Sequence, residues 1–334
     1  MESSFSFKTS RLSVDRGPED PTKIMSIIST LPKKEGLNPS YDLYQYQGFW
    51  IPLVYLQATL FMQENFKAQP SDIYVCSSIK TGTTWLKALA FSIVTRDIFD
   101  DSTNPLLTKV PHECLPFLES DYATNTKLDT DLPLLATHLP YTLLPQSILD
   151  CKIIYICREP KDTFVSMWHF IRRIEEENFI NNADVTLEQE FKWFCEGKSA
   201  YGPYWDHVLG YWKASIERPD RVLFLKYEDL KKETLCYVNK LADFMEKPFS
   251  TEEQARGVPE EIVARCRFES LSNLEVNKSG LHRPETLSGF SNSVFFRKGE
   301  IGDWKNLLTH NMEKSIDKIT QEKFQSLGLT FPTL

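Results

Sequence analysis

A single turn between a strand and a helix constrains the fold of this chain more than any other stretch. Residues 72–76 are β-branched, aromatic and apolar, a composition typical of a short strand that is buried on both faces. Residues 86–96 suit a helix, and the turn between them contains Lys80, Gly82 and three threonines. Such a turn directs backbone N–H groups, hydroxyls and an ammonium at one point beside a helix N-terminus. It therefore predicts a cradle for phosphate or sulfate.

The loop differs from the standard phosphate-binding loop of nucleotide kinases. In that loop, G-x-x-x-x-G-K-[ST], the lysine follows the second glycine. Here Lys80 precedes Gly82, and position 77 is not a glycine. Taken alone, the loop leaves a second interpretation open, in which its threonines only cap the helix that follows.

Composition restricts the class of protein. A chain of 334 residues with 41% apolar residues can form one large α/β domain or two small ones. A net charge of −8 argues against a general nucleic-acid binder. The seven cysteines form no C-x-x-C pair and suit a reducing compartment. We see neither a signal peptide nor a membrane-spanning run, so we expect a cytoplasmic protein that binds neither nucleic acid nor membrane.

Strand-like and helix-like segments alternate along the chain. Further strands are expected at 132–137, 152–157 and 221–226, with helices between and after them. This alternation predicts an α/β fold in which helices flank a mostly parallel central sheet. We expect residues 1–20 to be a disordered tail and residues 21–334 to form a single domain. The Asp-, Asn-, Thr- and Pro-rich stretch 97–131 is expected to be irregular.

Chemically useful side chains follow each expected strand. In an open parallel sheet, ligands bind beyond the carboxyl ends of the strands. The residues in that position are the turn at 80–84, His138, Arg158 and Tyr227. Each of them has an ordinary explanation as a core or surface residue. Together they predict an anion-binding crevice that also contains a titratable base.

Several segments resemble those of the cytosolic sulfotransferases, in the order found in that family and over about residues 75–304. They are K-T-G-T-T-W-L at 80–86, T-H-L-P at 137–140, R-E-P-K-D at 158–162, K-Y-E-D at 226–229 and F-R-K-G-E-I-G-D-W at 296–304. Two N-terminal segments, L-P-K at 31–33 and Y-Q-Y-Q-G-F-W at 44–50, resemble the plant branch in particular.

The resemblance implies an enzyme that moves a sulfuryl group from 3′-phosphoadenosine 5′-phosphosulfate (PAPS) to a hydroxyl of a small acceptor. The product would be adenosine 3′,5′-bisphosphate (PAP). In this reaction His138 would be the general base. Lys80 would bind the oxygen that bridges sulfur and the departing phosphate. No metal is expected, because a sulfuryl group carries less charge than a phosphoryl group and no metal-ligand cluster is visible.

The resemblance also implies which residues bind the cofactor. The 5′-phosphate is expected at the loop, and the 3′-phosphate at side chains that include a guanidinium fork. Adenine is expected to stack on aromatic rings, although a ring at a helix start can also be a core anchor. The predicted cofactor-binding residues are Lys80, Thr81, Gly82, Thr83 and Thr84 in the loop, Arg158, Ser166, Arg297, Lys298 and Gly299 at the 3′-phosphate, and Trp85, Phe268 and Tyr227 at the adenine.

Two positions depart from the pattern of the family. Many members have proline before the loop lysine, where this chain has Ile79. Animal members commonly have a lysine two residues before the histidine, where this chain has Ala136. A nucleotide-binding homologue with weak or absent turnover is therefore an alternative, and a small-molecule kinase is another. The animal dimer segment matches at Lys305 and Thr309 and then fails, so we expect a monomer.

The sequence leaves the acceptor open. Aromatic and aliphatic residues in segments 41–55, 97–131, 168–180 and 270–295 predict a pocket for a flat apolar hydroxyl compound. Candidates are a flavonoid, a steroid or brassinosteroid, or a hydroxyjasmonate, with a desulfoglucosinolate as a further possibility. The residues expected to contribute are Tyr46, Phe49, Trp50, Phe117, Tyr122, Trp168 and Phe179, although core packing is the alternative for the first three.

Overall fold

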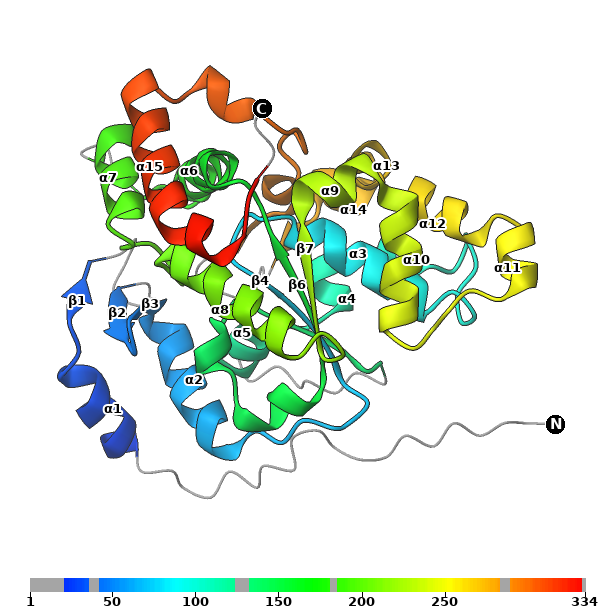
Figure 1. Cartoon of the computed structure of the whole chain (residues 1–334), viewed down its shortest axis with the longest axis horizontal. Helices are drawn as coiled ribbons and strands as arrows, with labels where there is room; N and C mark the ends of the chain where they lie inside the picture. The colour runs from blue at the N-terminus through cyan, green and yellow to red at the C-terminus, as the bar shows by residue number, and fades with distance from the viewer. Residues whose placement is uncertain (1–20, 36–41, 124–131, 181–184, 283–288, 332–334) are drawn as a thin grey trace.

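The computed structural model describes residues 21–35, 42–123, 132–180, 185–282 and 289–331, so the tail expected at 1–20 lies outside the described residues. Its centre is a four-stranded parallel sheet with helices on both faces (Figure 1). The strands, in spatial order, are β5 (Leu134–Thr137), β4 (Ile73–Ser77), β6 (Lys152–Cys157) and β7 (Val222–Lys226). The predicted fold class, a single α/β domain with a parallel central sheet, is confirmed.

The register of the sheet brings the strand ends together. Cys76 of β4 pairs with Thr137 of β5 on one side and with Tyr155 of β6 on the other. Cys157, the last residue of β6, pairs with Lys226, the last residue of β7. Because the strands are parallel and in step, the segments that follow them all leave from one edge of the sheet.

Each face of the sheet packs on its own hydrophobic core, because successive side chains of a strand point to opposite faces. Tyr74 and Tyr155 face the core that includes α2 (Leu53–Asn65) and α8 (Tyr204–Glu217). Val75 and Ile154 face the other core, which includes α3 (Thr83–Val94), α10 (Thr234–Phe244) and α12 (Val258–Arg265). All five residues of β4 are buried, in agreement with its apolar run from Ile73 to Cys76.

Most expected helices are present, with shifted ends. The outer helices are α1 (Pro21–Ser29), α6 (Pro160–Glu177), α7 (Leu187–Cys195), α9 (Tyr227–Lys232), α11 (Thr251–Ala255) and α15 (His310–Phe324). Helix α6 starts at Pro160, where proline suits the first turn. The helical segment after β7 is divided in two, because the backbone at Glu233 (φ −130°, ψ 47°) separates α9 from α10.

Two segments differ from expectation. The aromatic stretch before α2 forms a hairpin of β2 (Leu43–Tyr46) and β3 (Phe49–Pro52), with positive φ at Gln47 and Gly48. Such turns usually carry Asn-Gly or Asp-Gly, so Gln-Gly gave no signal. The stretch expected to be irregular contains the short helices α4 (Pro111–Cys114) and α5 (Leu118–Ala123). Helices this short show no usable periodicity in the sequence.

Candidate active site

The loop after β4 is shaped by two residues in left-handed backbone conformations. Gly82, at φ 109°, is the N-cap of α3, and Lys80 has φ 63°. Glycine adopts this region without penalty, whereas lysine does so at a cost that is often found at functional sites. Gly82 has no side chain that could cap the helix. The first backbone N–H groups of α3 therefore remain available to a ligand in front of the loop.

The Lys80 ammonium lies among rings and other cations. Its Nζ is 4.1 Å from the centroid of Phe170 and 6.0 Å from that of Phe295. Burial, aided by the positive charges of Arg158 and Arg297, lowers the pKa of Lys80 to about 7. Three cations that face one space make it attractive for a multiply charged anion.

The three loop threonines have different partners. The Thr81 hydroxyl lies 2.9 Å from the Ser78 carbonyl oxygen and 3.0 Å from that of Ile156, so it ties the loop to β6. The Thr83 hydroxyl is 2.6 Å from that of Ser77. The Thr84 hydroxyl is 2.9 Å from Nε2 of His112. The Thr81 hydroxyl is therefore used within the protein, so Thr81 can contribute to anion binding only through its backbone.

His138 follows β5, and its contacts leave a lone pair on one ring nitrogen. Its Nδ1 lies 2.8 Å from the carbonyl oxygen of Ser77, which can only accept a hydrogen bond. The neutral ring must therefore carry its proton on Nδ1, and Nε2 keeps a lone pair. Burial, reinforced by the charge of Lys87, lowers the pKa of His138 to about 3, so the ring is neutral at physiological pH.

Groups that the sequence did not indicate hold His138 in place. Its backbone N–H donates to the buried carboxylate of Glu119 at 2.7 Å, and its carbonyl oxygen is 2.9 Å from Nε2 of His207. The ring packs against Phe117 and Tyr201, with centroids 4.6 Å and 5.5 Å away. Glu119 is 19 residues away in sequence and His207 is 69, so no local spacing pattern reveals them.

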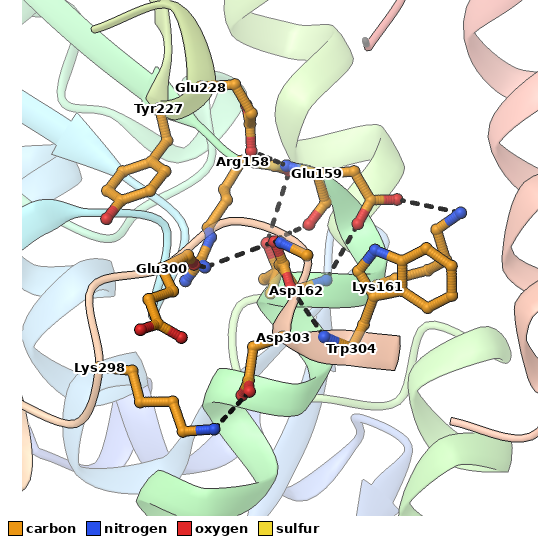
Figure 2. A network of polar contacts seen from close by, with 12 residues as sticks. Arg158, Glu159, Lys161, Asp162, Tyr227, Glu228, Lys298, Glu300, Asp303 and Trp304 are labelled. Atoms are coloured by element: carbon orange, nitrogen blue, oxygen red, sulfur yellow. Dashed lines mark hydrogen bonds and ion pairs between the residues drawn. The ribbon is translucent and has the colours of Figure 1, made fainter. Parts of the chain in front are cut away.

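Arg158 follows β6 and organises the next part of the site (Figure 2). Its Nη2 donates to the carbonyl oxygen of Glu300 at 2.5 Å and lies 3.5 Å from the Asp162 carboxylate. The guanidinium lies 4.7 Å from the ring centroid of Tyr227. Its buried Nε has no hydrogen-bond partner among the described residues. The side chain is thus fixed in direction while its Nε–H donor remains unused.

Asp162 connects this site to the C-terminal segment. Its two carboxylate oxygens accept hydrogen bonds from the backbone N–H groups of Gly302, at 2.7 Å, and Trp304, at 3.1 Å. Figure 2 shows Glu300, Asp303 and Trp304 next to Asp162, which lies in the first turn of α6. A single buried carboxylate therefore brings two distant parts of the chain together.

The segment 297–299 completes the basic side of the site. Arg297 and Lys298 each lie 2.6 Å from an oxygen of Asp303. Although burial opposes it, hydrogen bonds from Lys298, Asn306 and Arg297 hold the pKa of Asp303 well below its usual range. The Gly299 carbonyl oxygen accepts a hydrogen bond from the Tyr227 hydroxyl at 3.0 Å. The carboxylate thus fixes the two cations in direction and neutralises only one of their charges.

One cavity of about 1510 Å³ unites these groups. Every predicted site residue except Thr81 lines it, including Lys80, His138, Arg158 and Ser166. Phe268 and Trp85 also line it, and Trp85 meets Tyr227 edge to face at 5.6 Å. The structure therefore brings together residues that are spread over more than two hundred positions of the sequence.

The prediction of which residues form the acceptor wall is largely wrong. Phe117 lines the cavity, whereas Tyr46, Phe49, Trp50, Trp168 and Phe179 do not. The side chain of Tyr122 lies outside the described part of the structure. Trp50 is buried in the core, whereas the side chain of Phe179 is 95% exposed. The lining instead includes Tyr55, Phe170, Trp193, Tyr201 and Phe295. The aromatic content was visible in the sequence, but the direction of each side chain depends on tertiary packing.

Three further features concern the described residues as a set. They contain no helix that is both long enough and apolar enough to cross a bilayer. Within them, no three His, Cys, Asp or Glu side chains come together as metal ligands would. All seven cysteines are free thiols.

Comparisons with known proteins identify the family. Residues 70–328 match the sulfotransferase domain family. A flavonol sulfotransferase-like protein of Flaveria bidentis is 48% identical over 91% of this chain and 98% of its own length. Cytosolic sulfotransferase 16 of Arabidopsis thaliana is 46% identical over 92% of each chain.

Solved structures agree with the sequence comparisons. A sulphotransferase from Arabidopsis thaliana matches with a TM-score of 0.71 at 37% identity, over 95% of this chain and 98% of that one. A mouse sulfotransferase complexed with PAP matches with a TM-score of 0.63 at 25% identity, over 85% and 95% of the two chains. The protein belongs to the sulfotransferase family and is a sulfotransferase enzyme.

Proposed function

We propose that this sulfotransferase transfers the sulfuryl group of PAPS to a phenolic hydroxyl of a flat aromatic acceptor of the flavonoid type, with His138 as the general base. The observation that carries the proposal is the single cavity shared by the Lys80 ammonium and the neutral imidazole of His138. The ammonium of Lys80 suits the leaving phosphate, and the imidazole of His138 suits the attacking hydroxyl.

His138 accepts the proton of the acceptor. As the acceptor oxygen attacks sulfur, its hydrogen moves to Nε2, the nitrogen with the lone pair. The Ser77 carbonyl, 2.8 Å from Nδ1, supports the imidazolium that forms. The negative charge of bound PAPS also raises the pKa of His138, which makes the ring a better base once the donor is present.

Lys80 and the start of α3 support the leaving group. The bond between sulfur and the acceptor oxygen forms while the bond between sulfur and the bridging phosphate oxygen breaks. The ammonium of Lys80 compensates the charge that grows on the bridging oxygen. Backbone N–H groups at Gly82, Thr83 and Thr84 bind the 5′-phosphate, as a helix N-terminus suits.

The remaining residues bind the 3′ side of the nucleotide. Arg158 donates a charge-assisted hydrogen bond to the 3′-phosphate. Ser166, Arg297, Lys298 and the Gly299 backbone contribute to the same subsite. Trp85 and Phe268 stack on the adenine, and Tyr227 borders it. PAP in the related mouse structure supports the use of this nucleotide.

The cavity favours an aromatic acceptor. Near the base it is lined by the rings of Phe117 and Tyr201, and near Lys80 by Phe170 and Phe295. Aromatic walls of this kind favour flat rings. A phenolic hydroxyl, which ionises near pH 10 in tyrosine, gives its proton to imidazole more readily than an aliphatic alcohol does. Relatives named as flavonol sulfotransferases also support an aromatic acceptor.

The test measures sulfate transfer from labelled PAPS to flavonols, brassinosteroids, a hydroxyjasmonate and desulfoglucosinolates. We expect turnover with flavonols, a loss of roughly 100-fold or more in His138→Ala, and an unchanged Kd for PAP. Failure of PAP to bind would overturn the whole proposal. Full activity of His138→Ala would overturn the assignment of the base, and turnover of only non-aromatic acceptors would overturn the acceptor class.

A further inference from the structure

His112 is a buried imidazole that the reaction described above does not use. It belongs to α4, is 8% exposed and lines the cavity. Its ring lies between Phe295, with centroids 4.2 Å apart, and Phe117, at 5.5 Å. Its Nε2 is 2.9 Å from the Thr84 hydroxyl, and its Nδ1 has no partner among the described residues. The ring thus interacts with the phosphate-binding loop through one nitrogen.

The imidazole of His112 is uncharged in its surroundings. Burial is the main cause that lowers its pKa well below the ordinary value. The positive charge of Lys87 in α3 acts in the same direction, as does that of Lys80 in the loop. His282 in β8 (Leu281–His282) and His138, just after β5, would oppose a charge on His112 when they are themselves protonated. A neutral imidazole carries one N–H, so Nδ1 and Nε2 cannot both be donors.

The Thr84 hydroxyl also has only one hydrogen to donate. If it donates that hydrogen to Nε2 of His112, none remains for a phosphate. If Nε2 instead carries the N–H and donates to the Thr84 oxygen, the hydroxyl hydrogen is available to an anion. A phosphate oxygen is a stronger acceptor than a neutral imidazole nitrogen. A phosphate bound at the loop would therefore select the form of His112 protonated on Nε2.

We propose that His112 is a positioning residue for the sulfate donor, whose Nε2–H donates to Thr84 and thereby directs the Thr84 hydroxyl at the 5′-phosphate. This inference rests on the proposed function, in which the start of α3 binds that phosphate. It predicts that His112 contributes to affinity only through Thr84, and only for ligands that carry a 5′-phosphate.

Calorimetry with PAP tests the inference through four variants. Leucine in His112→Leu removes the donor, whereas the amide of His112→Gln keeps an N–H near the position of Nε2. We expect His112→Leu and Thr84→Val each to weaken PAP binding roughly 10-fold, as loss of a hydrogen bond to a charged group does. The double variant should be no weaker than either single one, and His112→Gln should stay within about threefold of the wild type.

A second ligand and a spectroscopic measurement separate positioning from simple structural support. Adenosine 3′-phosphate lacks the 5′-phosphate, so its affinity should be the same for His112→Leu and the wild type. In the PAP complex, ¹⁵N NMR of labelled histidine should show His112 protonated on Nε2. Additive losses in the double variant, or a proton on Nδ1, would overturn the inference. Failure of the wild type to bind PAP would instead overturn the proposed function.

Discussion

The loop between β4 and α3 packs directly on the ring of Tyr227. A Cβ atom added to Gly82 would lie 2.7 Å from Cδ2 of that ring, closer than such atoms approach in proteins. Tyr227 follows β7, two strands away from β4 in the sheet. The same ring contacts the guanidinium of Arg158. The two subsites expected for the 5′- and 3′-phosphates are therefore aligned by one aromatic side chain.

This contact predicts the effect of Gly82→Ala. The methyl group would displace either the loop or Tyr227, so we expect PAP affinity to fall at least about 10-fold and stability to fall by about 1–3 kcal/mol. Gly302→Ala is a matched control, because Gly302 also has positive φ (83°) but no atom lies within 4 Å of its Cβ position. Thermal unfolding and PAP calorimetry of both variants measure the difference, and equal losses of affinity would contradict the explanation.

Arg158 should determine the preference for a 3′-phosphate. Arg158→Lys keeps the positive charge but loses the planar guanidinium, which can donate two hydrogen bonds to one phosphate. We therefore expect the preference for PAP over adenosine 5′-phosphate, measured as the ratio of their affinities, to fall about 10-fold or more. The control is Arg173→Lys, the same exchange at a half-exposed side chain within α6. Competition binding with the two nucleotides gives the ratio. An unchanged ratio in Arg158→Lys would remove Arg158 from the 3′-phosphate subsite.

Lys80 should make PAP binding depend on pH. The pKa of free Lys80 is about 7, and a bound anion raises it, so PAP binding takes up a proton above that pH. Affinity should therefore fall as pH rises from about 7 to 9, at most about 10-fold per pH unit. Isothermal titration over this range measures the slope. In Lys80→Met the slope should disappear, and a slope that persists would assign the proton to another group.

Glu119 should affect kcat because it holds His138 in position. In Glu119→Gln the amide oxygen can still accept the His138 N–H, whereas Glu119→Ala removes this acceptor next to a buried donor. We expect kcat to fall roughly 10-fold or more in Glu119→Ala and much less in Glu119→Gln, because a misplaced base slows proton transfer. The Kd for PAP should be unchanged in both. A parallel loss of PAP binding would indicate general unfolding instead.

The sequence was sufficient to predict the sheet and the edge at which the site lies. Buried parallel strands have continuous apolar sequences, and residues just beyond them must meet at one edge, so His138, Arg158 and Tyr227 could be placed together. These features depend on local composition and on the order of elements along the chain. The hairpin at Gln47 and Gly48 was not predicted from the sequence, because its turn residues are unusual for that conformation.

Only the tertiary structure decided which partner each side chain of the site contacts. The Thr81 hydroxyl is used to hold the loop on β6, Arg297 and Lys298 share Asp303, and Glu119 supports the backbone of His138. The contacts of Thr81 and Glu119 join positions that are distant in sequence, and no periodicity or motif records which side chains will meet. The acceptor walls are a further case, because the direction of a ring is set by packing against elements elsewhere in the chain.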